Sequence, residues 1–335
     1  MNRAFLLSAR MELGHCPRAP MKRFLGIDIG GSKCGVCIGD SGMQVFSHRR
    51  IATAPGPEAT LAALENCARE LLRENGVVDA IGIVCGGPLD AKAGFVLSPP
   101  NLPGWDAVPV TAHFAGRLGV AAFLQNDANA CALAEWRHGA GRDSRNMMFC
   151  TMGTGFGCGL ILDGKLYEGT NGNAGELGHV RLTPDGPVGY GKAGSVEGYC
   201  GGAGIARLAR IRLGEWQASG RASALGVVAE LSAKTVAEAA RHGDTLAGLI
   251  YSEVGENLGR ALALAVDLLN LDCIVVGSIF VRNEALIRPA MERVLREECL
   301  AGALQACTVR AAELGDSVGN IAALTVAQIG LETMG

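Results

Sequence analysis

Aromatic residues are scarce in this sequence: Phe, Tyr and Trp make up 5% of its 335 residues. The core therefore has to be built from aliphatic side chains. An excess of either charge is also lacking, because 30 Lys and Arg stand against 33 Asp and Glu, a formal net charge of −3. That balance argues against a protein whose main task is to coat nucleic acid. With 49% hydrophobic and 19% charged residues, disorder of the whole chain is excluded as well.

Long apolar runs and repeated cysteine motifs are missing too. No apolar run approaches the ~20 residues that a membrane-spanning helix needs, and 12 cysteines in 335 residues are far too few for a disulfide scaffold. Cys34 and Cys37 form one CxxC, but they fall in a predicted strand, where residues three apart face opposite sides. No second CxxC completes a four-cysteine zinc site. We therefore expect a cytoplasmic protein with no membrane partner.

The first 20 residues are not typical of a secretory leader. Their apolar core, Ala4–Leu7, is too short for a signal peptide. We interpret residues 1–20 as a disordered extension, or as sequence upstream of a true start at Met21.

Glycine, by contrast, is abundant: its 48 residues are about twice the average share. There is no Gly-X-Y period, so a collagen-like structure is excluded. The glycines gather in short runs between apolar segments, as expected of loops that hold a ligand close to the backbone.

Apolar runs and segments of helical spacing alternate along the chain. This alternation predicts an α/β fold with mixed sheets covered by helices, and the length predicts about two domains. The predicted strands are 24–29, 34–39, 81–85, 120–124, 147–151, 159–162 and 272–276, and the predicted helices are 58–75, 128–138, 254–269 and 317–329.

Two segments of the chain are similar to each other. In each, an apolar strand leads into a glycine turn that carries a hydroxyl, and a second apolar strand follows; the turns are Asp28–Lys33 and Thr151–Gly155. Two related units with one such turn each predict two lobes around a single phosphate-bearing ligand.

The first turn has the residue types that bind phosphate and magnesium. Gly30 and Gly31 let backbone N–H groups approach an anion, while Ser32 adds a hydroxyl and Lys33 a positive charge. Asp28, at the end of the strand, is an oxygen ligand of the kind that Mg²⁺ prefers. The spacing is not that of a P-loop, and an ordinary hairpin turn is the alternative.

The second turn, Gly153-Thr154-Gly155, is followed by a strand rather than a helix. That order argues against a Rossmann dinucleotide site, in which a helix follows the turn. A hairpin that wraps phosphate oxygens fits better, and a glycine-bulged hairpin is the alternative.

Further polar residues stand at predicted element ends. Asn126 and Asp127 lie where a strand meets a helix, so they can cap the helix, and Asp127 can also accept a proton from an attacking hydroxyl. Glu176, His179 and Glu197 are typical partners of a polyhydroxylated ligand such as a sugar, although a lone histidine is more often structural.

Together these segments resemble the ROK family of sugar kinases, within the actin/hexokinase-like ATPase superfamily. The resemblance runs from Met21 to the C-terminus. It implies a two-lobed, ribonuclease H-like fold with a small lobe (21–125 plus 316–335), a large lobe (126–315) and a sugar- and nucleotide-binding cleft between them. It also implies a homodimer. The segments that carry it are Gly26–Lys33, Asn101–Trp105, Asn126–Ala130, Gly153–Gly155 and Gly175–His179.

The resemblance implies a role for each site residue. Asp127 matches the general base, and Asp28 is expected near the Mg²⁺ of Mg·ATP. The expected phosphate-binding residues are Gly30, Gly31, Ser32, Lys33, Gly153, Thr154 and Gly155, and the expected sugar-binding residues are Asn101, Asn126, Asp127, Glu176, His179 and Glu197.

The sequence departs from the family pattern at two places. Val188, Tyr190 and Ser195 stand where many members have zinc-binding cysteines, so we predict no structural zinc and a loop packed by Val188 and Tyr190 instead. Gly277-Ser278-Ile279 replaces a triple glycine near the expected adenine site. ATP is the default phosphoryl donor, with polyphosphate as the alternative.

The function implied by the resemblance is ATP-dependent phosphorylation of a hexose, with glucose to glucose 6-phosphate as the first choice. The alternatives are N-acetylmannosamine, N-acetylglucosamine, fructose, mannose or allose as substrate, or a non-catalytic sugar-responsive regulator. A DNA-binding regulator is disfavoured because only 20 residues precede the first strand, and no nucleic-acid partner is expected.

Overall fold

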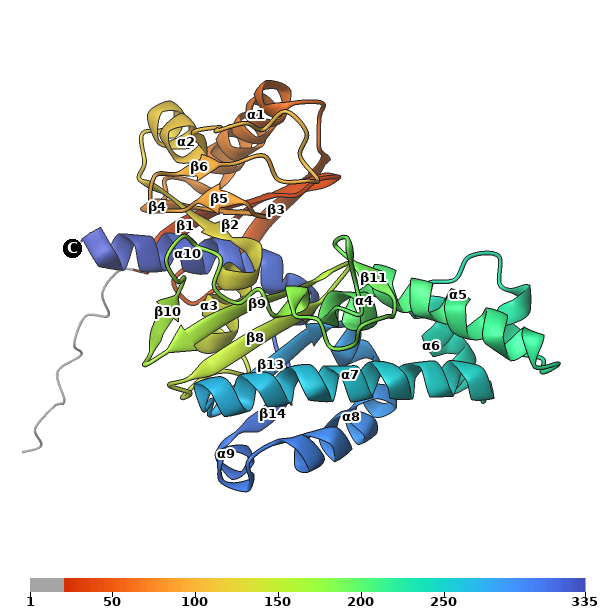
Figure 1. Cartoon of the computed structure of the whole chain (residues 1–335). Coiled ribbons are helices and arrows are strands. Elements are labelled where there is room, and N and C mark those ends of the chain that lie inside the picture. Colours follow the sequence, from red (N-terminus) through yellow and green to blue (C-terminus); the bar gives the residue numbers. More distant parts are fainter. Residues whose placement is uncertain (1–20, 335) are drawn as a thin grey trace, which may run out of the picture.

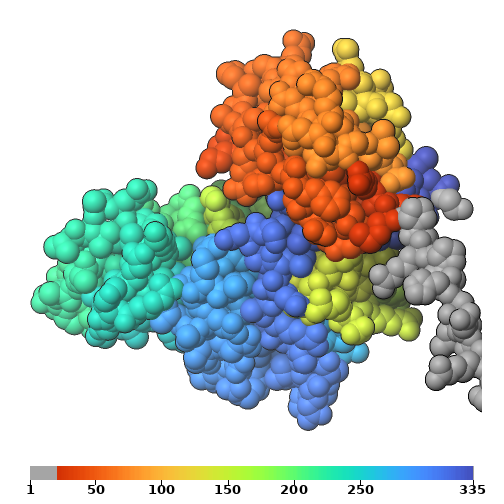
Figure 2. Space-filling view, turned by 180° about the vertical axis from the view of Figure 1, so that it is seen from behind, coloured from red at the N-terminus to blue at the C-terminus, as the bar shows by residue number. Residues whose placement is uncertain are grey.

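The computed structural model describes residues 21–334 and has an α/β fold built on two five-stranded sheets (Figure 1). The extension expected at residues 1–20 lies outside the described residues. Each sheet has helices on both of its faces. Viewed from behind, the N-terminal part of the chain forms one mass and the middle and C-terminal parts form another (Figure 2).

The first sheet begins as an antiparallel meander and continues with parallel strands. The predicted strand–turn–strand at the start of the chain is confirmed, since β1 and β2 pair antiparallel, from Arg23 opposite Asp40 to Ile29 opposite Cys34. β4 runs parallel to β1, and β7 runs parallel to β4. The order across the sheet is β3 (Val45–Ala52), β2 (Lys33–Asp40), β1 (Arg23–Ile29), β4 (Ala80–Cys85) and β7 (Ala122–Asn126).

The second sheet repeats this arrangement strand for strand. β8 and β9 form the predicted antiparallel hairpin, and β13 and β14 continue the sheet in parallel from β8. The order is β10 (Lys165–Tyr167), β9 (Phe156–Leu162), β8 (Met147–Met152), β13 (Cys273–Ser278) and β14 (Thr308–Ala311). The two similar units predicted from the sequence are therefore two sheets of one design. Two-residue strands form two further hairpins: β5 (Leu89–Asp90) with β6 (Phe95–Val96), and β11 (Val188–Gly189) with β12 (Lys192–Ala193).

Two helices lie between the sheets. α3 (Asp127–His138) packs alanines against the first sheet's core and Ala132 and Leu133 against the second sheet's core. α10 (Val318–Met334) crosses β1 and β4, where Gly82 allows a close approach: a Cβ there would lie 1.9 Å from the Ala323 carbonyl oxygen. Figure 1 shows α10, in blue, beneath the strands of the first sheet.

The remaining helices cover the outer faces. α1 (Pro57–Asn75) and α2 (Val110–Leu118) pack on the first sheet through an aliphatic core that includes Leu64 and Phe114. On the outer side of the second sheet, one core joins the sheet to α4 (Val196–Cys200), α7 (Thr245–Leu269), α8 (Ile279–Glu298) and α9 (Ala301–Ala306). α5 (Gly202–Ala218) and α6 (Ala233–Arg241) pack on α7 and extend beyond the sheet (Figure 1). The 3₁₀ turns are η1 (Leu177–His179), η2 (Ala224–Val227) and η3 (Gly315–Ser317).

Several elements differ from the sequence predictions. α7 begins at Thr245 rather than at Val254, because Asp244 caps it there and Leu246 and Ile250 are buried, so packing extends the helix across Gly248. β3, α2, α5, α6, α8 and α9 were not predicted. Cys34 and Cys37 belong to cores on opposite faces of the first sheet, as their strand position predicts. Within residues 21–334, the helices are all too short or too polar to span a bilayer.

Candidate active site

Two aspartates meet at one edge of the first sheet. Asp28 stands near the end of β1, and Asp127 follows directly after β7; because these strands point the same way, their carboxyl ends meet. Burial and the nearby Asp127 charge raise the pKa of Asp28 to about 6, against a smaller lowering effect of Arg50. The carboxylates are therefore close enough to repel each other, as expected where a cation or a proton is to be held.

Asp127 also has a raised pKa. Asp127 is an exposed residue, yet the protein atoms around its carboxylate reduce the hydration of the charged form, which raises its pKa. The backbone N–H of Ala128, which donates to Asp127 Oδ1 at 2.8 Å, opposes this effect in part. A carboxylate with a raised pKa is a stronger base than an ordinary aspartate, so Asp127 is suited to accept a proton.

Asn126 caps the helix that carries Asp127. Its Oδ1 accepts from Ala128 N at 3.0 Å and from Asn129 N at 3.4 Å. The other end of this amide faces the Gly86-Gly87 turn, since a Cβ on Gly87 would lie 3.4 Å from Asn126 Nδ2. Capping and ligand binding are thus compatible here, because the cap uses only the oxygen.

The first glycine turn is held open by its neighbours. Thr53 Oγ1 donates to Gly30 O at 2.6 Å, and Thr53 N donates to Ser32 O at 3.1 Å. Gly31 lies against Asn101, because a Cβ on Gly31 would come within 2.6 Å of the Asn101 Cβ and carbonyl oxygen. The turn therefore leaves Gly31, Ser32 and Lys33 exposed, and it brings Asn101 beside them.

A cavity of about 140 Å³ adjoins this turn on the side of α10. Arg50 and Asp316 line it, and sequence reasoning missed both. Arg50 could have been found from β3, where it stands opposite Gly35 in the ladder, whereas Asp316 comes from the far end of the chain. The full lining is Asp28, Lys33, Cys34, Gly35, Arg50, Asp316, Gly319 and Asn320.

The second glycine turn is fixed from behind by α4 and α5. Gly202 N donates to Gly153 O at 2.8 Å, and Ala203 N donates to Thr154 O at 3.1 Å. Glu197 lies beside the turn, where its Oε2 accepts from Phe156 N at 3.1 Å; a Cβ on Gly155 would lie 2.6 Å from that oxygen. The structure thus brings Glu197 to the second turn.

Glu176 and His179 are placed by glycines that dock on the second sheet. Gly175 has a φ of 89° and approaches Cys158 O so closely that a Cβ would lie 2.5 Å from it. Gly178 approaches Phe156 O in the same way, and a Cβ on Gly178 would lie 2.2 Å from that oxygen. Only glycine fits these contacts, so both glycines fix η1, with its flanking Glu176, against β9.

Residues 24–329 match the sequence model of the ROK family. The chain belongs to this family. It is 31% identical to a glucokinase of Thermotoga maritima over 82% of this chain and 88% of the relative. It is 33% identical to an N-acetylmannosamine kinase of Salmonella typhi over 76% of this chain and 81% of the relative.

Two solved ROK structures share the fold. A ROK glucokinase from Streptomyces griseus in complex with glucose and AMPPNP is 31% identical, with a TM-score of 0.75 over 93% of this chain and 100% of that chain. A ROK transcriptional regulator, a homolog of the E. coli MLC protein, is 26% identical, with a TM-score of 0.83 over 93% of this chain and 80% of that chain. The predicted actin-like ATPase fold is confirmed.

The loop that lacks the ROK cysteines is not packed as we expected. Val188 and Tyr190 are 42% and 66% exposed, so the expectation that they fill the loop is wrong. Val188 begins β11, whose other residue, Gly189, is buried, and Tyr190 lies in the turn that follows. Ser195 closes the loop instead: it is buried, donates to Lys192 O at 3.1 Å and accepts from Gly198 N at 3.1 Å.

His179 is held by this same loop. Lys192 Nζ donates to the His179 carbonyl oxygen at 2.7 Å, and the Tyr190 ring meets the imidazole edge-on at 5.1 Å between centroids. In the part of the chain from 21 to 334, no three His, Cys, Asp or Glu side chains are grouped to hold a metal ion. That zinc is not bound remains a prediction.

The second departure from the ROK pattern places a serine in a conformation that favours glycine. Ser278 takes a φ of 57°. Its hydroxyl lies 3.5 Å from Thr151 Oγ1, beside the second turn. Such a backbone conformation costs a non-glycine residue on the order of 1 kcal/mol.

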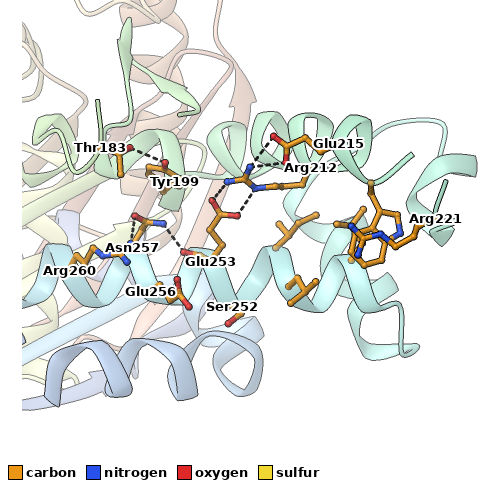
Figure 3. A pocket seen from close by; sticks show the side chains of 14 residues that line it. Thr183, Tyr199, Arg212, Glu215, Arg221, Ser252, Glu253, Glu256, Asn257 and Arg260 are labelled. Carbon is orange, nitrogen blue, oxygen red and sulfur yellow. Dashed lines mark hydrogen bonds and ion pairs between the residues drawn. The ribbon is translucent and has the colours of Figure 1, made fainter. Parts of the chain in front are cut away.

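A larger cavity of about 620 Å³ lies away from these residues, between α5 and α7 (Figure 3). Its charged side chains are largely engaged with one another. Arg212 pairs with Glu253 and Glu215, and Arg260 donates to Asn257. It contains none of the residues expected to bind ATP or sugar.

Proposed function

We propose that this protein is a hexose kinase that transfers the γ-phosphoryl group of ATP to a sugar hydroxyl, with glucose as the expected acceptor and glucose 6-phosphate as the product. The observation that carries the proposal is that parallel strands bring two aspartates, Asp28 and Asp127, to the same edge of the first sheet, beside a glycine turn. Membership of the ROK family and the two kinase relatives support it.

Asp127 is proposed as the general base. Its carboxylate takes the proton of the sugar hydroxyl while the hydroxyl oxygen bonds to the γ-phosphorus and the bond from that phosphorus to ADP breaks. The raised pKa of Asp127 favours this proton transfer. Phosphoryl transfer otherwise depends mainly on positioning and charge neutralisation.

Mg·ATP is the proposed phosphoryl donor. Asp28 fits the metal, since it is an oxygen ligand whose charge is poorly compensated and whose pKa is raised to about 6. When bound, Mg²⁺ neutralises phosphate charge. The proposed phosphate contacts are the exposed groups of Gly30, Gly31, Ser32 and Lys33 on the first turn, and of Gly153, Thr154 and Gly155 on the second.

The sugar is proposed to lie against Asn101, Asn126, Glu176, His179 and Glu197. Glucose is the first choice because the T. maritima relative and the S. griseus neighbour are both named glucokinases. N-acetylmannosamine is the second candidate, because the S. typhi relative has the higher identity over a shorter match. We also propose a cytoplasmic homodimer with no nucleic-acid partner.

The test is ADP release by the full chain with Mg·ATP against glucose, mannose, fructose, allose, N-acetylglucosamine and N-acetylmannosamine, with a no-sugar control. One sugar is expected to give ADP release that Asp127→Asn abolishes. The highest kcat/KM identifies the substrate, and a parallel run with polyphosphate, followed by the formation of sugar phosphate, tests the donor. Sugar binding measured by calorimetry without sugar phosphate formed from either donor would overturn the proposal in favour of a regulator, as in the MLC homolog.

A further inference from the structure

Gln125 is a buried polar residue beside the site that no role above uses. It is the second-last residue of β7 and directly precedes Asn126 and Asp127. Its Oε1 accepts from Asn126 N at 2.7 Å and from Asn129 Nδ2 at 3.3 Å. Gln125 therefore holds both ends of the first turn of the helix that carries Asp127.

These contacts fix the orientation of the Gln125 amide. A backbone N–H can only donate, so the atom that meets Asn126 N must be the side-chain oxygen. The Nε2 group consequently points the other way, and it donates to Glu168 Oε1 at 3.2 Å. This contact joins the amide of Gln125, in the first sheet, to the carboxylate of Glu168, which comes directly after β10 of the second sheet.

Glu168 belongs to the segment that leads to Glu176 and His179. It follows β10 directly, and its carbonyl oxygen accepts from Ala174 N at 3.2 Å, which closes the intervening loop. The next residue, Gly175, is docked on β9. A short loop, closed by this hydrogen bond, thus connects Glu168 to Glu176.

We propose that Gln125 and Glu168 are positioning residues that tie the base-bearing segment of one sheet to the sugar-binding segment of the other. Neither residue touches the reacting atoms. The contact sets the distance between Asp127 and the sugar that Glu176 and His179 hold. This inference rests on the proposed kinase function and extends it to two residues that the function did not include.

The pair offers a charge-swap test. Gln125→Glu keeps an oxygen for Asn126 N and Asn129 but places two carboxylates about 3 Å apart, which is repulsive. The double variant, Gln125→Glu with Glu168→Gln, restores the contact with the roles exchanged. The amide at position 168 then donates to the carboxylate at position 125. Gln305→Glu, on the exposed face of α9, is the matched control for an added carboxylate.

The readout is steady-state kinetics of the full chain with the best sugar and with ATP. Gln125→Glu is expected to lower kcat/KM for the sugar about tenfold, a coupling within the range seen for contacting residues. The KM for ATP stays within about twofold of the wild-type value. The double variant recovers to within about threefold of wild type, and Gln305→Glu matches wild type.

The contrary outcomes are equally clear. If Gln125→Glu retains the wild-type kcat/KM, or if the double variant loses at least the product of the single losses, the positioning role is wrong. Should Gln125→Glu fail to fold, Glu168→Ala removes the contact from the half-buried side and is expected to show the same sugar-specific loss. A wild-type protein that forms no sugar phosphate from ATP or from polyphosphate overturns the kinase function instead. The same variants are then compared by their Kd for the sugar.

Discussion

The two glycine turns occupy equivalent places in two sheets of the same strand order, yet their chemistry differs. The first turn is surrounded by charge: Asp28, Lys33, Arg50 and Asp316 line the cavity next to it. The second turn carries no charged residue of its own, and its carboxylate partner, Glu197, reaches it through a backbone N–H. The comparison teaches that one backbone design can supply charge in one lobe and mainly hydrogen-bond donors in the other.

The ends of the last strands differ in the same way. After β7, the chain enters α3 with Asp127 exposed. After β14, the N–H groups of Glu313 and Leu314 donate instead to Glu135, a fully buried residue of α3, at 3.2 and 3.0 Å. Equivalent strand ends are thus followed by the proposed base in the first sheet and by a structural anchor in the second.

The largest expected effect is on kcat, and it comes from removing the carboxylate of Asp127, the proposed base. Asp127→Asn keeps the size and the hydrogen bond from Ala128 but cannot accept the proton, so kcat is expected to fall about 10²- to 10⁴-fold. The measurement is ADP release at saturating sugar and ATP, with far-ultraviolet circular dichroism as the folding control. A kcat within tenfold of wild type would contradict the base assignment.

The anchor carboxylate is expected to affect stability rather than catalysis. Glu135 also accepts from Ala140 N at 2.8 Å, so Glu135→Gln weakens charge-assisted bonds to three backbone N–H groups. The expected loss is about 3 kcal/mol in the free energy of unfolding, measured by urea denaturation. The value of kcat should stay within about twofold; a large fall in kcat without loss of stability would show that the two strand ends are not functionally distinct.

Asp28→Asn is expected to raise the stability of the ligand-free protein at pH 8. The folded-state pKa of Asp28 is raised from 3.8 to about 6, so the ionised form is the costly one in the folded state. In the wild-type protein, the contribution of Asp28 to the free energy of unfolding is fully present below pH 4. It is lost as the pH rises through 6, because the carboxyl group ionises. Thermal unfolding in EDTA should show a gain on the order of 2 kcal/mol at pH 8 that disappears near pH 4. An equal gain at both pH values would rule out ionisation as its cause.

A smaller effect is expected at the second turn. In Gly155→Ala, the added Cβ would lie 2.6 Å from Glu197 Oε2, so Glu197 has to move away from Phe156 N. We expect the KM for ATP to rise about tenfold, equivalent to 1.4 kcal/mol. Gly248→Ala, at a helix position with open space around it, is the matched control and should be silent. An unchanged KM would mean that the second turn does not approach the phosphates.

The sequence predicted the parts of the molecule that short patterns encode. Apolar runs that end in glycine turns predicted both hairpins. The strand-to-helix junction at Asn126 predicted the position of Asp127 in the fold. The roles assigned to these residues remain predictions. Packing of Val188 and Tyr190 was predicted wrongly, because the buried Ser195 closes this loop through its hydrogen bonds and both larger side chains stay exposed.

Contacts between distant segments were beyond prediction. One such contact is between Gln125 and Glu168, and another is between Glu135 and Leu314. Both depend on how the two sheets are stacked. Arg50 and Asp316 reach one cavity from opposite ends of the chain. No local pattern encodes these distances, since burial and backbone hydrogen bonds across the lobes define them.

The position of α10 also has a consequence for synthesis. The inner face of the first sheet is covered by residues 318–334, and Ala322, Ala323 and Ala327 are buried in the same core as Phe24. The ribosome makes that helix after all the strands of both sheets. The nascent first sheet therefore emerges with one apolar face uncovered, and it can complete its core only after residues 318–334 have left the exit tunnel.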